Sequence, residues 1–433
     1  MQTTRRTFLK SSLALGGASV LNIVFTNRAD AKAANTPALI LFHAGGGWDT
    51  ANGLDARLKG GEDEAAILTA LFGENTAGKK LVNTIGPFRY RADHPAIKRF
   101  LEANSGNLAV FIAKMATNDH GAGTDNMATG SLTMDDPSIG ALFAKTFAED
   151  SLPTPFIVAG GSTKTGSLVP VANLGSVEDL RRVLSPNQVD RDGQQLFYPT
   201  EVASLINTFR RDRVAERLKD TVIPAHMHAL RQILLVAKGK EKLTHIADQL
   251  TREYPEGYDP VTEVLLDLIN LGMVRSISLS SGGFDTHGQD GQRQLPETMA
   301  RYFDQISKFW TRAKERHLSG RVLIVGGSEF SRTPNLNGGG GTDHWPGTNT
   351  LFLLGNSIVS QMIGASDDAW YAKALDPKKL TPKREQDGGV IPTVADFHLA
   401  LRQITKIENS LTTRFPLTGS GIDHEVLAKK LTR

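Results

Sequence analysis

The sequence contains no cysteine among its 433 residues. This absence excludes a disulfide framework, a thiolate nucleophile and a metal site built on sulfur. Any metal ion bound by this chain would therefore have to be held by histidine, aspartate, glutamate or other oxygen ligands.

The sequence also lacks a strong excess of charge of either sign. Its 49 basic and 46 acidic residues give a formal net charge of +3. The first 31 residues alone carry that excess, since Arg5, Arg6, Lys10 and Arg28 oppose a single acid, Asp30. The rest of the chain is close to neutral, so we expect neither nucleic acid nor an anionic membrane as a partner.

A long apolar run is missing as well. The longest candidate near the N-terminus, Leu13–Phe25, is short and contains Gly and Ser. A permanent membrane helix needs about 20 mostly apolar residues. The sequence therefore predicts no stable membrane anchor.

What the N-terminus does contain resembles a bacterial twin-arginine export signal. The paired Arg5 and Arg6 are followed by Phe8-Leu9-Lys10, by the apolar segment and by the small-x-small pattern Ala29–Ala31. This order of basic, apolar and cleavage regions is typical of an export signal. We therefore expect residues 1–31 to be a signal peptide, and the twin-arginine export machinery to be a partner. That pathway exports folded proteins, so the mature protein would be periplasmic or extracellular.

Beyond the signal, short apolar runs closed by Gly, Ser or Asn predict buried strands. They are Ala38–Phe42, Leu108–Ile112, Phe156–Val158, Val274–Leu279, Val322–Val325 and Thr350–Leu354. Apolar residues from Leu295 to Ala313 recur at helical spacing and predict a helix between two of these strands. The two strands should be parallel. We predict one α/β domain over residues 32–433, with a mostly parallel central sheet flanked by helices and a charged helical insertion at about 201–252.

Ionisable side chains follow three of the predicted strands. In a parallel sheet, sites form beyond the carboxyl ends of the strands, and glycines there let the backbone turn sharply. The candidates for one shared metal site are Asp49, Asp285, His287, Glu329 and His344. This set suits Zn²⁺ or Mn²⁺, and its oxygen-rich half could also hold Mg²⁺ or Ca²⁺. Some of the carboxylates could instead orient the imidazoles.

The same motifs carry a family resemblance. The segments Gly282–His287, Val325–Pro334 and Thr342–Pro346 resemble the C-terminal signature of the bacterial domain-of-unknown-function family 1501. The segments Gly46–Asp49 and Asn118–Gly130 are also similar to that family. The resemblance implies a fold of the alkaline phosphatase and sulfatase superfamily, with nearly the whole mature chain included.

The resemblance implies metal-binding roles for Asp49, Asp285, His287 and His344. Two departures are visible in this sequence. Asp285 and His287 are two residues apart where the phosphatase-type pattern has four, and Glu329-Phe330 stands where an Asp-His pair usually follows the strand. One imidazole is therefore missing from the pattern, and the site would hold one ion or two.

In the superfamily a nucleophile sits at a helix N-terminus beside the metal. By pattern that position falls on Asn126, whose amide does not form a phosphate or sulfate ester in the ordinary way. Thr124 is the nearest hydroxyl that could replace it, and direct attack by water is the alternative. Arg332 could clamp the oxyanion, because a guanidinium binds two oxygens at once. His43 and His120 would line the same pocket.

Two functions are compatible with these observations. The first is metal-dependent hydrolysis of a phosphate or sulfate ester, of small-molecule or polymer type. The second is a non-catalytic metal-binding or ligand-binding protein derived from the same fold, which Asn126 and Phe330 favour. Five candidate ligands favour the first.

Overall fold

The computed structural model describes residues 36–148, 154–174, 195–224 and 258–433, together with residues 152, 187, 189, 226, 227, 229–231, 233 and 234. The predicted signal peptide lies outside these residues, as does much of the predicted insertion. Export and the proposed domain limits therefore stay predictions.

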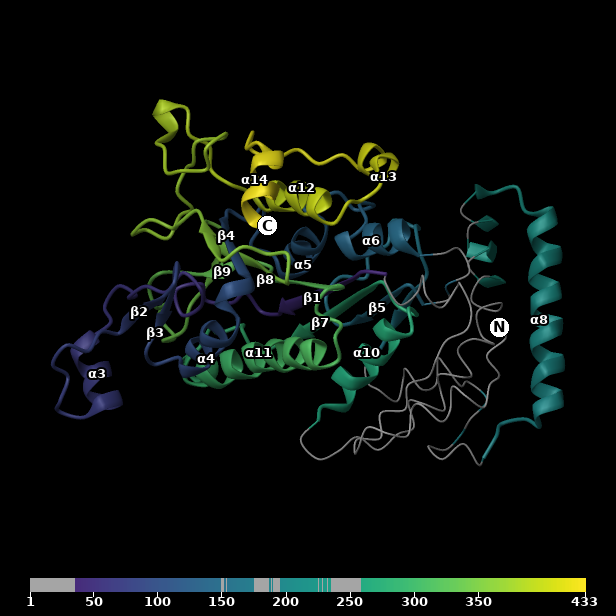
Figure 1. Cartoon of the computed structure of the whole chain (residues 1–433), viewed down its shortest axis with the longest axis horizontal. Helices are drawn as coiled ribbons and strands as arrows, with labels where there is room; N and C mark the ends of the chain where they lie inside the picture. The colour runs from purple at the N-terminus through teal and green to yellow at the C-terminus, as the bar shows by residue number, and fades with distance from the viewer. Residues whose placement is uncertain are drawn as a thin grey trace, which may run out of the picture.

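An eight-stranded sheet occupies the centre of the molecule (Figure 1). Its strands are β1 Ala38–Ala44, β4 Leu108–Ala113, β5 Phe156–Ala159, β6 Val171–Asn173, β7 Ser276–Ser281, β8 Val322–Ser328, β11 Asn349–Leu354 and β12 Gln361–Ile363. They lie in the order β12-β4-β11-β8-β1-β7-β5-β6. Neighbouring strands are parallel except where β11 runs antiparallel to β4 and β8. The predicted α/β fold with a mostly parallel central sheet is therefore confirmed.

All six predicted strands are present, and β8 shows why one of them is longer than predicted. Its apolar run ends at Val325, but the strand continues through Gly326 and Gly327 to Ser328. A side chain on Gly326 would lie 2.0 Å from the ring of Phe352 on β11. The glycines here admit the neighbouring strand's side chains and do not end the strand.

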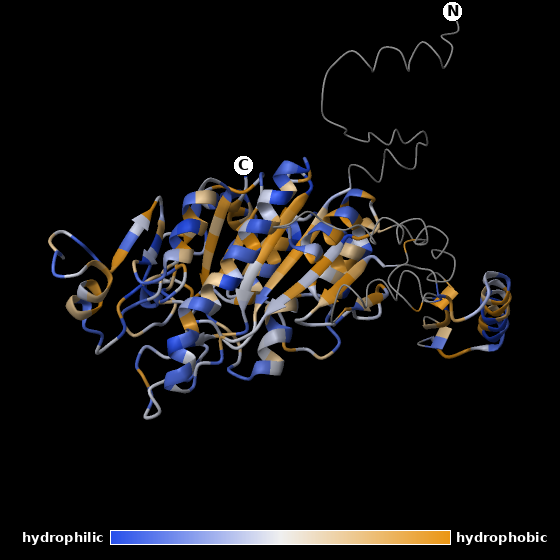
Figure 2. Cartoon of the chain, turned by 90° about the horizontal axis from the view of Figure 1, so that it is seen from below, coloured by the Kyte–Doolittle hydropathy of each residue, from blue (hydrophilic) through white to orange (hydrophobic). Residues whose placement is uncertain are grey.

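Helices cover both faces of the sheet (Figure 1). One face packs against α4 Pro95–Asn104, α10 Pro260–Asn270 and α11 Gln289–Glu315. The other packs against α5 His120–Thr129, α6 Ile139–Phe147, α12 Val394–Ile404 and α14 His424–Leu431, with α13 Asn409–Arg414 beside them. Figure 2 shows the strands as mainly hydrophobic, whereas the covering helices carry hydrophilic residues as well. The sheet is therefore buried on both sides, as the unbroken apolar runs predicted.

The longest covering helix, α11, is the one predicted from its apolar stripe. Its buried residues recur at helical spacing from Leu295 to Ala313. α11 connects β7 to β8, and both strands pair in parallel with β1, which lies between them. The loops that follow β1, β7 and β8 consequently emerge at the same edge of the sheet.

The remaining elements lie outside the central sheet. They are α3 Glu64–Phe72, β2 Val82–Ile85, β3 Phe88–Arg91, β9 Ser331–Arg332, β10 His344–Trp345, the 3₁₀ turns Ser105–Asn107 and Glu385–Asp387, and α8 Thr200–Asp220. α8 falls within the predicted helical insertion, and none of its residues is buried. Within the part of the chain that the structure describes, no helix is both long and apolar enough to span a membrane.

Candidate metal centre

Three segments that are distant in the sequence meet beyond the carboxyl ends of the central strands. The loop after β7 carries Asp285 and His287, and β10 carries His344. The third segment is the start of α5, where Asp119 caps the helix through its bond to the Ala122 amide and His120 is the first helical residue. Local capping therefore fixes His120 at the edge where the other three groups gather.

Three of these side chains form a group that could hold a metal ion. His120, Asp285 and His344 each offer one ligand atom, and these atoms lie within 4.8 Å of one another. His287 joins them, since its Nε2 lies 2.9 Å from Nε2 of His344 and 3.2 Å from Oδ1 of Asp285. The structure thus brings Asp285, His287 and His344 together, as the sequence predicted, and adds His120, which had been expected only to line the pocket.

The hydrogen bonds of the three imidazoles determine which nitrogen carries the proton. Nδ1 of His344 lies 2.7 Å from the carbonyl oxygen of Asn118, which can only accept. Nδ1 of His287 faces Oδ1 of Asp343 at 3.0 Å, and Nδ1 of His120 faces Oε1 of Glu329 at 2.9 Å. Each Nδ1 is therefore the donor, and the Nε2 of each ring faces Asp285.

When these rings are neutral, two lone pairs face each other at the short contact between His287 and His344, and a cation shared by the two rings would satisfy both. Ligand atoms that share a tetrahedral ion at about 2.1 Å are about 3.4 Å apart. The four contacts among Nε2 atoms and Asp285 oxygens are 2.9, 3.2, 3.6 and 3.8 Å. These distances bracket the expected separation, so the residues fit a divalent cation.

The charge state of the cluster also suits metal binding. Burial lowers the pKa of His344, and the nearby Arg332, His120 and His287 lower it further, against the opposing bond to Asn118. Burial would raise the pKa of Asp285, but the hydrogen bond and charge of Arg332 hold it below its usual range. At neutral pH the imidazole of His344 is thus free to coordinate and the carboxylate of Asp285 is charged.

Glu329 lies behind the imidazoles. Its Oε1 accepts from Gly46 N at 2.6 Å and from His120, while Oε2 lies 3.1 Å from His43 Nε2. Burial would raise the pKa of Glu329, but the hydrogen bond and charge of His43 and the bond from His120 hold it well below its usual value. The structure therefore places this carboxylate where it orients His120.

Asp49 lies apart from this cluster. Its Oδ2 is 2.5 Å from Nζ of Lys59 and also accepts from the Asn52 side chain at 3.1 Å. Asp49 and Lys59 are 1% and 6% exposed, so the ion pair is enclosed by the protein. The ammonium of Lys59 therefore binds the Asp49 carboxylate, for which the family resemblance implied a metal-binding role.

Arg332 is fully buried, and its guanidinium is already bonded. It donates to the carbonyl oxygens of Gly46, Gly47 and Thr342 and to Oδ1 of Asp285, the last at 2.6 Å. These bonds hold the glycine loop after β1 against the loop after β7. To act as the predicted oxyanion clamp, Arg332 would have to give up at least one of them.

The predicted nucleophile positions lie on α5. Thr124 is one helical turn beyond His120 on the same face, and it lines a small cavity of about 20 Å³ together with His43 and His398. A cavity of this size holds about one water molecule. Asn126 is 1% exposed, and its Oδ1 lies 3.5 Å from Ala116 N. Neither side chain is among the groups that meet at Asp285.

Phe330 closes the cluster from the side of the sheet. Its ring centroid lies 4.9 Å from that of His120 and 4.3 Å from that of His344, and the side chain is fully buried. Gly47, at φ 75°, permits this position, because a Cβ there would lie 2.2 Å from the Phe330 ring. The residue that replaces an expected histidine thus supplies an apolar wall.

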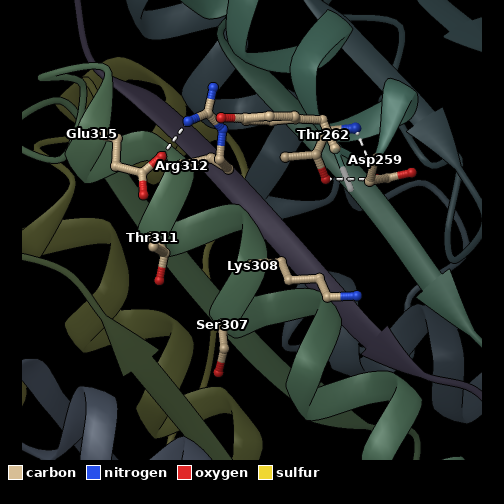
Figure 3. A pocket seen from close by; sticks show the side chains of 8 residues that line it. Asp259, Thr262, Ser307, Lys308, Thr311, Arg312 and Glu315 are labelled. Carbon is tan, nitrogen blue, oxygen red and sulfur yellow. Dashed lines mark hydrogen bonds and ion pairs between the residues drawn. The ribbon is translucent and has the colours of Figure 1, made fainter. Parts of the chain in front are cut away.

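A larger cavity, of about 350 Å³, lies between α10 and α11 (Figure 3). Figure 3 shows Thr311, Ser307 and Lys308 spread along α11, while Asp259 and Thr262 lie opposite them. Arg312 at its edge stacks on Tyr258 at 4.3 Å. No histidine lines this cavity, so it is not the candidate metal centre.

Comparison with known proteins agrees with the sequence motifs. Residues 267–382 match the model of a family described as a protein of unknown function, DUF1501. The resemblance to this family is confirmed. The matched DUF1501 segment contains Asp285, His287, Glu329, Arg332 and His344. A comparison with curated proteins gave no match.

Solved structures with partial similarity include sulfatases and an alkaline phosphatase. The PsFucS1 sulfatase from Pseudoalteromonas sp. is 10% identical, with 94% of this chain and 75% of that chain covered and a TM-score of 0.36. The protein Ps i-CgsB in complex with k-i-k-neocarrahexaose is 10% identical, with 92% and 77% covered and a TM-score of 0.35. The alkaline phosphatase from the Antarctic bacterium TAB5 is 12% identical, with 74% and 92% covered and a TM-score of 0.30. These TM-scores are too low to support the fold assignment, which therefore rests on the order of the strands in the sheet.

Proposed function

We propose that this protein is an exported, metal-dependent hydrolase of phosphate or sulfate esters. The observation that carries the proposal is the convergence of three imidazole Nε2 atoms on the carboxylate of Asp285. Three acceptors orient these imidazoles from behind, an arrangement typical of metal-ligating histidines.

The donor atoms support a single ion of the Zn²⁺ type. Three nitrogens and one carboxylate suit Zn²⁺ better than Mg²⁺ or Ca²⁺, which prefer oxygen. Asp49 and Glu329, the two other predicted carboxylate ligands, are bonded to Lys59, His43 and His120. Bound there, a divalent cation would polarise an ester oxygen and lower the pKa of water.

The residues around the centre would position the substrate. The side chains of His120, Asp285 and His287 are 40%, 50% and 47% exposed, so an ester can reach them from solvent. The first turn of α5 starts at His120, and helix N-termini attract anions through their free N–H groups. An ester oxyanion could be held there without disturbing Arg332.

Direct attack by water fits this geometry better than attack by Thr124. The cavity at Thr124 has room for about one water molecule and none for an ester group. The half-exposed cluster, in contrast, is open on the solvent side. We therefore assign the reaction to water activated at the cluster.

A second function is supported by the same features. Asn126 is buried, and four of the five N–H donors of Arg332 are bonded within the protein. A site with neither a side-chain nucleophile nor a free guanidinium would also serve a non-catalytic metal-binding or ligand-binding protein.

The experiment that separates these functions measures metal and turnover together. Elemental analysis of natively exported protein should find close to one equivalent of a divalent ion. A panel of phosphate and sulfate esters should then be hydrolysed by the wild-type protein and not by His344→Ala. If the wild-type protein contains metal but hydrolyses no ester, the non-catalytic binding function remains. If the wild-type protein contains no metal, the proposed metal centre is wrong.

The proposed export signal is tested separately. Replacing Arg5→Lys together with Arg6→Lys should leave uncleaved precursor in the cytoplasm. Normal release of mature protein by this variant would contradict export by the twin-arginine pathway.

A further inference from the structure

Glu329 connects the candidate metal centre to a residue outside it. Its two carboxylate oxygens face two different imidazoles, Nδ1 of His120 at 2.9 Å and Nε2 of His43 at 3.1 Å. Glu329 and His43 are 2% and 7% exposed, so water does not replace these bonds easily. The buried carboxylate is therefore held between the two rings.

Proton counting makes His43 the main donor to Oε2. Ser328 Oγ lies 2.8 Å from that oxygen but also 2.5 Å from the carbonyl oxygen of Ala44. One hydroxyl proton serves only one of these acceptors, and the shorter contact is with Ala44. With the serine proton given to Ala44, the hydrogen bond to Oε2 comes from His43.

Without that donor the orientation of Glu329 would change. A buried carboxylate oxygen that loses its donor becomes costly, so the group would turn towards another partner. Such a rotation would also move Oε1, which fixes the ring of His120 and its tautomer. The orientation of one proposed ligand thus depends on a side chain at the end of β1.

We infer that His43 is a positioning residue of the metal centre, which acts through Glu329 on His120. The inference rests on the proposed metal centre. His43 would not touch the ion, because its Nε2 is bonded to Glu329. Its contribution would be to keep the lone pair of His120 directed at Asp285.

Two substitutions at His43 test this, with Co²⁺ as the probe. His43→Ala removes the donor, whereas His43→Gln keeps an N–H at nearly the same distance from the backbone. We expect His43→Ala to weaken Co²⁺ binding about tenfold and to change the visible absorption of the bound ion, since outer partners of ligating histidines typically contribute 10–100-fold. His43→Gln should restore most of the affinity and the wild-type absorption.

The matched control is His398→Gln. His398 borders the same small cavity and is also buried, but it bonds to the carbonyl oxygen of Met127 and not to Glu329. This variant should keep the Co²⁺ affinity and absorption of the wild type. Thermal unfolding of each metal-free variant checks that the proteins compared are folded.

The outcomes distinguish the two proposals. Wild-type affinity and absorption in folded His43→Ala would overturn the role of His43 and leave the metal centre standing. An equal loss of affinity in His398→Gln would also overturn it, because cavity packing would then explain the effect. A wild-type protein that takes up no Co²⁺ would contradict the metal centre and this inference together.

Discussion

Asp49 and Asp285 occupy equivalent positions in the sequence but very different places in the molecule. Each follows a central parallel strand and a glycine-containing turn, and each bonds to a basic side chain. Asp285 is 50% exposed and is surrounded by three imidazoles, whereas Asp49 is enclosed with Lys59. A carboxylate beyond a strand end thus becomes a candidate ligand only where imidazole nitrogens lie close to it.

The two acids also differ in whether a carboxylate oxygen remains available next to the basic partner. Arg332 uses Oδ1 of Asp285, while Oδ2 remains directed towards His120. At Asp49, Lys59 and Asn52 bond one oxygen and the amide of Ala51 bonds the other. One carboxylate can therefore still accept a cation, and the other is already satisfied.

The strongest test of this comparison replaces each acid by its amide. Asp285→Asn should lower metal affinity by more than about 100-fold, because a ligating carboxylate and its charge are lost. Asp49→Asn should leave the metal content unchanged. Elemental analysis and competition with a chelator measure both. Loss of metal in Asp49→Asn but not in Asp285→Asn would contradict this comparison, because Asp49 would then be the ligand.

Removing the ammonium at the enclosed pair should affect stability and not metal. Lys59→Met leaves the charge of Asp49 buried without its partner, which costs about 3–5 kcal/mol. The double variant Lys59→Met, Asp49→Asn should recover part of that loss. Denaturant unfolding of the metal-free proteins gives these values, and a loss below about 1 kcal/mol in Lys59→Met would show that the pair is not enclosed.

Buried histidines extend the comparison to pH. Burial lowers the pKa of His398 to about 4, against the opposing effect of its bond to Met127. The unfolded chain, with an ordinary imidazole pKa near 6.5, therefore binds more protons, and stability should fall as the pH drops from about 6.5 towards 4. The loss from His398 alone would be about 3 kcal/mol.

Unfolding of metal-free His398→Gln across that pH range should show a shallower decline than the wild type. A decline remains in the variant, because burial also lowers the pKa of His94 to about 4. An identical pH profile in the two proteins would show that His398 takes up its proton without unfolding.

The smallest effect is expected at Thr124. If water attacks the ester directly, Thr124→Val should change turnover by less than about fivefold, which is below about 1 kcal/mol. Steady-state rates with an ester accepted by the wild type provide the measurement. Complete loss of turnover with metal retained, or a phosphorylated or sulfated Thr124 found by mass spectrometry, would make Thr124 the nucleophile.

The fold could be predicted from the sequence where buried elements show a continuous apolar pattern. The apolar runs of the central strands and the stripe of α11 identified the sheet and its main covering helix. The hairpin of β2 and β3 was not predicted, because most of its residues are only partly buried and lack a clear alternation. The end of β8 was missed because Gly326 makes room for Phe352 and Gly327 for Leu351, contacts that no local pattern records.

The site was predictable as a set of residue types and not as a set of contacts. Asp285, His287 and His344 follow strand ends or glycines, and they do meet. His120 was undervalued because its position depends on the cap of α5. Lys59 had no sequence signal as the partner of Asp49, because an ion pair across a loop of ten residues has no characteristic spacing.

The path of the chain through the metal centre has a consequence for proteolysis. His120 and Asp285 are separated by more than a third of the chain, and His344 lies beyond α11 and β8. An ion shared by these groups would act as a cross-link that closes long loops, in the manner of a disulfide in a chain without cysteine. Without the ion, the exposed residues between β9 and β10 would be held by hydrogen bonds among their own turns and to the loop after β7. Proteases should therefore cut the metal-free protein first at this segment, while the sheet is still folded.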